Sequence, residues 1–151
     1  MWIWGRASIG IAAPPVAVWS WLVERDKQKR WLRDEIEWLP ADLSELRAGY
    51  RGTEIMQLPD GPSEARIELV EFEPPRRMVV RQEHAIFAAR SLFVLDPRGG
   101  GTRVTSSVRI RYRSWQTWLG VLPVAPFYSR VVKGGLRDLK QLVEDGSTPP
   151  T

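Results

Sequence analysis

The sequence predicts an α+β domain in which an antiparallel sheet is covered on one face by a single long C-terminal helix. Three observations predict this fold class. Apolar residues recur at helical spacing between residues 127 and 144. Residues 102–112 alternate strictly between apolar or small and charged or polar side chains. Most of the chain before them divides into short alternating segments separated by proline and glycine.

The C-terminal helix is predicted over residues 127–144. Pro126 suits its first turn, and Gly146 supplies its end. Charged residues recur at similar intervals, each one position after an apolar residue of the helix, which gives the helix one solvated face. Its apolar face is formed by residues at intervals of four, three and four: Val132, Leu136, Leu139 and Val143.

The N-terminal part predicts one strand and two short helices. Ile3, Ile9 and Ile11 share one parity of a strand over residues 2–11, whereas two tryptophans, Trp2 and Trp4, fall on the other parity. The sequence leaves open which face those tryptophans occupy. A first helix begins at Pro15, and a second is predicted over residues 27–32; both are too short to form a core alone.

The remaining strands follow one another through turns rich in proline and glycine. The last of them carries arginines on one parity, so one face of the sheet is solvated and only the other is covered. The predicted strands are residues 35–39, 50–58, 65–73, 76–83, 88–96 and 102–112.

Length and composition predict a single domain over residues 1–146 with a disordered tail at 147–151. The absence of cysteine excludes disulfides and a cysteine nucleophile, and the single histidine excludes a histidine-rich metal site. We therefore expect no metal and no cofactor. The chain has a net charge of +4, but basic and acidic residues are interspersed, which argues against nucleic acid as a partner.

The N-terminal stretch lacks the basic start and the uninterrupted apolar run of a signal peptide. No run of 18 apolar residues exists that could span a membrane. These patterns predict a cytoplasmic protein, either a monomer or a homodimer.

Several short motifs, spread over nearly the whole chain, occur together in one order: I-A-A-P-P-V-A-V-W at 11–19, Leu22, Trp31, Gly49, E-F-E-P-P-R-R at 71–77, G-G-T-R-V-T at 100–105 and L-R-D-L-K-Q-L-V-E at 136–144. On these residues the chain resembles the START-like, or SRPBCC, superfamily, near its polyketide cyclase/dehydrase branch and more distantly the birch-pollen allergen type. Glu24 stands where the family often has an aspartate, which keeps the charge.

This resemblance implies a helix-grip fold, in which a curved seven-stranded antiparallel sheet wraps around the C-terminal helix and encloses a deep apolar cavity. It implies no universal catalytic residue. Ordinary core packing is the alternative for every predicted cavity residue. The candidates come from the inward parity of the strands, the last helix and the segment before it: Tyr50, Met56, Ile67, Leu69, Met78, Val80, Phe93, Val104, Val108, Ile110, Trp118, Phe127, Val131, Gly135 and Leu139.

Two features of the C-terminal part have two interpretations each. Gly134 and Gly135 are costly inside a helix, so they make room either for a ligand or for close approach of the sheet. The uncharged, apolar segment 115–128 is either a lid at the cavity mouth that rests on a membrane surface or a buried approach to the helix. In both cases we expect some exposure around residues 115–120.

Three functions are compatible with these patterns. The first is carriage or sequestration of a hydrophobic small molecule such as a lipid, a quinone or a polyketide-like aromatic. The second is a cyclase or dehydratase in which His84, Tyr50 or Arg81 moves protons in the same cavity. A lone histidine at a strand end is, however, more often a surface or hydrogen-bonded residue. The third is a module that presents residues 115–128 to a membrane or a protein.

Overall fold

The computed structural model describes residues 2–31, 40, 42–58, 61–121, 123 and 125–146, without the side chains of 56–58, 121 and 127. Their elements in chain order are β1 (Trp2–Ile11), α1 (Pro15–Val23), α2 (Arg25–Trp31), the 3-10 turn η1 (Leu43–Glu45), β2 (Arg51–Leu58), β3 (Gly61–Glu73), β4 (Arg77–Glu83), β5 (Phe87–Arg98), β6 (Gly101–Tyr112), α3 (Trp115–Val121), the 3-10 turn η2 (Ala125–Phe127) and α4 (Tyr128–Gly146).

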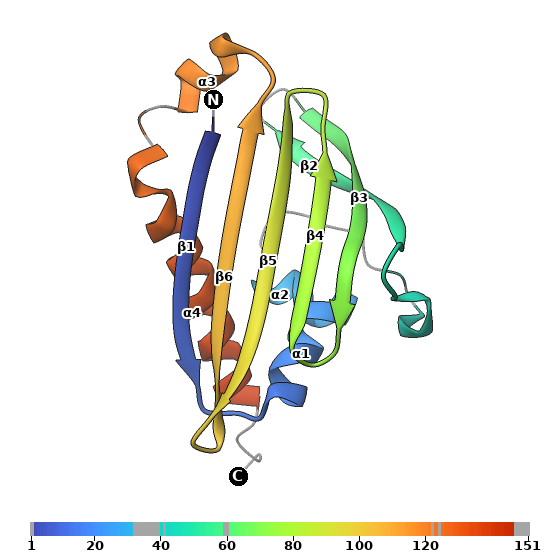
Figure 1. The fold of residues 1–151 in the computed structure, drawn as a ribbon, viewed down its shortest axis with the longest axis vertical. Helices are drawn as coiled ribbons and strands as arrows, with labels where there is room; N and C mark the ends of the chain where they lie inside the picture. The colour runs from blue at the N-terminus through green and yellow to red at the C-terminus, as the bar shows by residue number, and fades with distance from the viewer. Residues whose placement is uncertain are drawn as a thin grey trace.

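The described strands form one antiparallel sheet in the order β1-β6-β5-β4-β3-β2, and α4 runs along one face of it (Figure 1). This arrangement confirms the predicted α+β class and the helix-grip fold. The described sheet has six strands rather than the predicted seven. The strand predicted over residues 35–39 and the tail predicted at 147–151 lie outside the described residues.

The core lies at the end of the sheet where the β5–β6 turn meets α1. Helix α1 is apolar on nearly all sides and contacts α4, β5 and β6. Leu95 and Val104 are directly opposite each other on β5 and β6 and are 1% and 0% exposed. Together these residues close one end of the space between sheet and helix. The other buried members of this cluster include Ile11, Val18, Leu22, Leu69, Leu136, Leu139 and Val143.

Side chains of α4 bind the backbone along the free edge of β1. An edge strand exposes unpaired N–H and C=O groups that another chain could pair with, and α4 covers these groups. The backbone groups that α4 binds belong to every second residue from Arg6 to Ala12, the last of which directly follows β1. The contacts are Ser129 Oγ accepting from Arg6 N (3.1 Å), Lys133 Nζ donating to Ser8 O, Lys140 Nζ donating to Gly10 O (2.8 Å) and Glu144 Oε1 accepting from Ala12 N (2.9 Å).

Gly5 lets the start of α4 lie directly against β1. A Cβ atom at this position would lie 2.7 Å from Cδ1 of Tyr128 and 2.8 Å from Cγ2 of Val132. Both distances are shorter than van der Waals contact, so any side chain here would push the helix away. The absence of a side chain at Gly5 therefore sets how closely helix and sheet approach.

The two tryptophans of β1 lie on the sheet face opposite to that of the buried Ile3. Trp2 and Trp4 are 41% and 60% exposed. The guanidinium carbon of Arg109, on the neighbouring strand β6, lies 4.4 Å and 4.2 Å from the centres of their rings. These cation–π contacts cover part of the aromatic surface. The two tryptophans thus occupy the solvated face of the sheet, which the sequence left open.

Replacing Gly5 by alanine is expected to lower the free energy of unfolding by about 1–3 kcal/mol, because the added Cβ overlaps Tyr128 and Val132. Gly10 is the matched control, since it lies in the same strand and its added Cβ would meet nothing within 4 Å. Urea unfolding of Gly5→Ala and Gly10→Ala measures both effects. Equal stability of the two variants would show that α4 is not held this closely.

Candidate functional site

A cavity of about 610 Å³ lies between the sheet and the helices, within the range of small-molecule sites. The inner faces of the strands from β2 to β6 form one side of it, and α1, α2, α3 and α4 contribute the other. Its wall is mainly apolar. The strand residues of this wall are Glu54, Ile67, Met78, Val80, Gln82, Phe87, Ala89, Ser91, Phe93, Ser106, Val108, Ile110 and Tyr112, and the helices add Leu22, Gln28, Trp31, Thr117, Tyr128, Val131, Val132, Gly135 and Leu136, with Ile86 from the β4–β5 turn.

The strand register sets the depth of the cavity. Paired residues of an antiparallel sheet point to the same face, so each inward pair of β5 and β6 forms one step along the wall. The pairs that line the cavity are Phe87 with Tyr112, Ala89 with Ile110, Ser91 with Val108, and Phe93 with Ser106. The next inward pair, Leu95 with Val104, belongs to the closed core.

Eight of the predicted ligand-binding residues line this cavity. They come from four strands and from α4, and their parity or helical position was the basis of the prediction. Their contact with a ligand stays a prediction. These residues are Ile67, Met78, Val80, Phe93, Val108, Ile110, Val131 and Gly135.

Other predicted residues do not line it. Leu69, Val104 and Leu139 are each 0% exposed and pack in the core beyond the closed end of the cavity. Tyr50 packs against the core from the start of β2, and Trp118 contacts Tyr112 from α3. The side chains of Met56 and Phe127 lie outside the described part of the chain.

The prediction missed the polar residues of the wall. Glu54 is 4% exposed although its neighbour Ile55 is 43% exposed, which reverses the usual polarity of a strand. The pairing of β2 with β3, which places Glu54 opposite Ala65, sets this orientation. A one-residue shift in register would reverse it, and sequence alternation alone does not reveal the register.

The polar wall residues have specific partners. The amide Nε2 of Gln82 donates to Oε2 of Glu54. Gln28 is 4% exposed, and its Nε2 donates to the carbonyl of Leu22 at 3.4 Å. The indole Nε1 of Trp31 donates to the carbonyl of Trp21 at 2.9 Å, so Trp31 presents an apolar ring to the cavity.

Two tyrosines provide hydroxyl groups at the end of the cavity nearest α3. Burial raises the pKa of the Tyr112 phenol. Burial, and secondarily the neighbouring Tyr112, raises the pKa of Tyr128. Both phenols are therefore protonated at neutral pH and are hydrogen-bond donors rather than bases.

The three residues proposed for proton transfer do not share a site. None of His84, Tyr50 and Arg81 lines the cavity. Arg81 forms an exposed ion pair with Glu68. Burial is the main cause that raises the pKa of Tyr50. These residues do not line the cavity, and their acid–base role stays an untested prediction.

His84 has a structural environment instead. It is 5% exposed, its Nδ1 accepts from the backbone N–H of Ile86 at 3.2 Å, and its Nε2 lies 2.7 Å from Oγ of Ser63. Because Nδ1 accepts, a neutral ring carries its proton on Nε2 and donates it to Ser63. The imidazole also stacks on Phe87 at 4.8 Å between ring centres. His84 therefore ties the β4–β5 turn to β3.

Close approach to the sheet explains neither of the two glycines of α4. A Cβ added at Gly134 or Gly135 would meet no atom within 4 Å, so neither glycine serves close approach to the sheet. Gly135 lines the cavity. The missing side chain there leaves room inside the cavity, whereas close approach occurs at Gly5.

Exposed apolar side chains occur beside the end of the cavity nearest α3. Ile86 and Val131, which line the cavity, are also 40% and 60% exposed. On α3, Trp115 and Leu119 are 59% and 50% exposed, which confirms the expected exposure around residues 115–120. No helix in the described part of the chain is long and apolar enough to cross a membrane.

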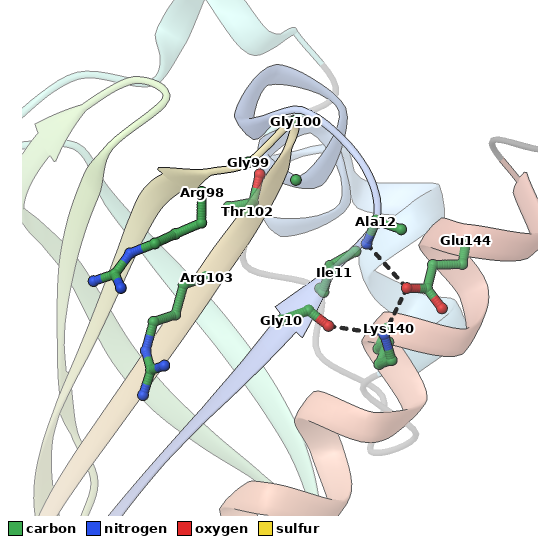
Figure 2. Close-up of a pocket in the computed structure, with 11 residues that line it drawn as sticks. Gly10, Ile11, Ala12, Arg98, Gly99, Gly100, Thr102, Arg103, Lys140 and Glu144 are labelled. Atoms are coloured by element: carbon green, nitrogen blue, oxygen red, sulfur yellow. Dashed lines mark hydrogen bonds and ion pairs between the residues drawn. The ribbon is translucent and has the colours of Figure 1, made fainter.

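A second hollow lies at the opposite end of the sheet, around the β5–β6 turn (Figure 2). Its charges are used to hold α4: Lys140 and Glu144 pair at 2.6 Å and both bind the backbone near the end of β1. The hydrogen bonds from Lys140 and the Ala12 N–H lower the pKa of Glu144. Arg98 and Arg103 point away from this pair. No group of three histidine, aspartate or glutamate side chains in the described residues could hold a metal.

Comparison with known proteins identifies the family. A model of the family "Polyketide cyclase / dehydrase and lipid transport" matches residues 5–144. The chain belongs to this family. A search of curated protein sequences finds no match. The polyketide cyclase/dehydrase family thus supports hydrophobic ligand binding or cyclase-type activity as the general class of function.

Solved structures show the same fold at low sequence identity. A protein from Rhizobium leguminosarum has a TM-score of 0.67 at 15% identity, with 96% of each chain covered. Ms6760 from Mycobacterium smegmatis has a TM-score of 0.63 at 18% identity, covering 97% of this chain and 91% of that one. DynU16, a protein in the dynemicin biosynthetic locus, has a TM-score of 0.69 at 16% identity, covering 95% of this chain and 48% of that one.

Proposed function

We propose that the protein binds an apolar small molecule, such as a lipid, a quinone or a polyketide-like aromatic, in the cavity between sheet and α4. The observation that carries the proposal is the cavity of about 610 Å³ with mainly apolar walls. Protein interiors rarely leave voids much larger than a water molecule, so a space of this size is not a packing defect. Burial of apolar ligand surface, at about 25 cal/mol per Å², would supply the affinity.

The sequence keeps this space open with small side chains. Ala89, Ser91 and Ser106 lie on the inner faces of β5 and β6, and Gly135 faces them from α4. Leucine or phenylalanine at these positions would fill the cavity with protein atoms. Small residues placed between larger apolar ones leave space in the wall, which supports the proposal that the cavity binds a small molecule.

Carriage or sequestration is preferred to cyclase or dehydratase activity. The residues proposed for proton transfer lie outside the cavity, and two of the groups inside it are protonated tyrosines. Among the described wall residues, Glu54 is the one carboxylate that could serve a cyclase-type reaction as a base. The simplest role for the described wall is to hold and orient an apolar molecule.

Replacing Gly135 by leucine is expected to weaken binding of an apolar dye such as Nile red by about 100-fold or more, because the new side chain fills the cavity. The fold should remain intact, since leucine favours a helix by up to about 1 kcal/mol over glycine. Dye fluorescence titration measures the affinity, and thermal unfolding measures the stability.

Gly134→Leu is the matched control for this experiment. It makes the same change one residue earlier in α4, at a position that does not line the cavity. Its dye affinity should stay close to that of the unchanged protein. Retained binding by Gly135→Leu, with an unchanged melting temperature, would refute the location of the site.

A second candidate function is contact with a membrane surface through the exposed residues of α3. Trp115 and Leu119 extend the apolar surface of Ile86 and Val131 beside the cavity. Tryptophan suits the boundary between water and lipid, and a cytoplasmic protein with net charge +4 would be attracted to an anionic leaflet. Such contact would let an apolar ligand pass between bilayer and cavity without crossing water.

The membrane proposal predicts that the protein floats with anionic lipid vesicles at low salt and that the double variant Trp115→Ser, Leu119→Ser stays in the bottom fractions. Trp4→Ser is the control, because Trp4 is also 60% exposed but lies in β1 rather than α3. If all three proteins float equally, or if none floats, α3 is not a membrane-contact surface.

A further inference from the structure

The outer face of the sheet, which points away from the cavity and α4, separates basic from acidic side chains. On β1, β5 and β6 the residues that alternate with the inward ones point to this face. Asp96, opposite Arg103 beside the β5–β6 turn, is the one carboxylate among them in the described residues. The glutamates of the outer face belong instead to β3 and β4, where they form ion pairs: Arg77 with Glu71, Arg81 with Glu68 and Arg113 with Glu83.

Two arginines of β6 have no carboxylate partner. Arg109 and Arg111 are exposed, and neither forms an ion pair with any described residue. Arg109 also lies directly opposite Arg90 of β5, whose guanidinium is 4.0 Å from the Glu71 carboxylate. Like charges directly opposite each other in a sheet are destabilising. The fold bears this cost without a carboxylate beside Arg109, which indicates an anion from outside the chain.

The side chain of Arg109 is held in place by two indole rings. Its guanidinium carbon lies 4.4 Å from the ring centre of Trp2 and 4.2 Å from that of Trp4. The guanidinium carbon of Arg111 lies 5.7 Å from the ring centre of Trp2. A guanidinium that stacks on a ring keeps the N–H groups at its edge for hydrogen bonds, and this planar fork matches the oxygens of a phosphate.

Each arginine has a tryptophan directly opposite it in the sheet. Trp2 is paired with Arg111 and Trp4 with Arg109, at the ends of β1 and β6 that lie side by side near α3 (Figure 1). The two pairs are therefore about 7 Å apart along the strands. The tryptophans are 41% and 60% exposed, so aromatic surface stays accessible beside the arginines. The surface thus repeats one ring and one guanidinium.

A single-stranded nucleic acid repeats the complementary groups, one base and one phosphate in each nucleotide. Proteins bind such strands by stacking bases on aromatic side chains and pairing phosphates with basic ones, and some do so on the exposed face of an antiparallel sheet. A lipid headgroup or an acidic peptide would supply the anion but no ring for the indoles. Along the chain, basic and acidic residues are interspersed, which argued against nucleic acid; the fold separates them.

We infer that the outer face binds single-stranded nucleic acid at Trp2, Trp4, Arg109 and Arg111, with phosphates on the guanidinium groups and bases on the indole rings. This site lies on the opposite side of the sheet from the cavity, so the inference is independent of the proposed binding of an apolar molecule. Two ring and guanidinium pairs would hold about two nucleotides directly.

Fluorescence anisotropy of a fluorescein-labelled oligothymidylate of about twelve nucleotides measures the binding at low and rising salt. Arg109→Gln is expected to weaken it and to reduce the slope of log affinity against log salt by about 0.7, the loss of one phosphate contact. Arg103→Gln is the matched control: it removes the same charge from the same face of the same strand, about 20 Å away. It should leave the slope close to that of the unchanged protein.

The contribution of the rings is measured separately. Trp4→Ser should weaken the binding about tenfold, because base stacking is lost, and should leave the salt slope unchanged. Trp115→Ser is its control, since Trp115 is 59% exposed but lies on α3. It should bind like the unchanged protein.

Competition in the unchanged protein decides even where a variant does not fold. Unlabelled oligothymidylate should displace the labelled strand better than inorganic polyphosphate of equal charge or vesicles of anionic lipid. Equal displacement by polyphosphate or vesicles would show that the face attracts anions without stacking bases, and the inference would be wrong. The absence of binding at low salt, or an equal effect of Arg109→Gln and Arg103→Gln, would overturn it as well.

Discussion

The fold depends on how α4 is held against the edge of β1. Side chains from Ser129 to Glu144 bind the free backbone of that strand, and Gly5 removes the side chain that would keep the helix away. This fixes α4 along β1 rather than over the middle of the sheet (Figure 1). The inner faces of the remaining strands are consequently not covered by α4 alone. The cavity is a result of where the helix is anchored.

The two ends of the space between sheet and helix differ in their packing. At one end, α1 and the pair Leu95 and Val104 form a closed core that provides much of the buried apolar surface. Towards α3, small residues and Gly135 leave room, and apolar side chains such as Val131 are exposed. The closed core and the cavity thus lie towards different ends of one layer and share a boundary. The residues that belong to both the core cluster and the cavity wall include Leu22, Trp31, Ile67, Met78 and Leu136.

Much of the fold follows from the sequence because its elements are strongly periodic. The alternation in β6 predicted the inward positions of Val108 and Ile110, and the helical spacing predicted α4. Depth along a strand was not predictable: Val104 has the same parity as Val108 but lies in the core, because α1 closes that end. The inward orientation of Glu54 depends on strand register, and that of Gln28 on tertiary packing, which local patterns do not contain.

Native mass spectrometry of the gently purified protein, compared with its denatured mass, tests the central claim most directly. The account predicts an added mass of about a few hundred daltons, typical of a ligand for a cavity of this size, that organic extraction releases as an apolar compound. A protein that carries no added mass, and takes up none after incubation with lipids, quinones or apolar aromatic compounds, would contradict it.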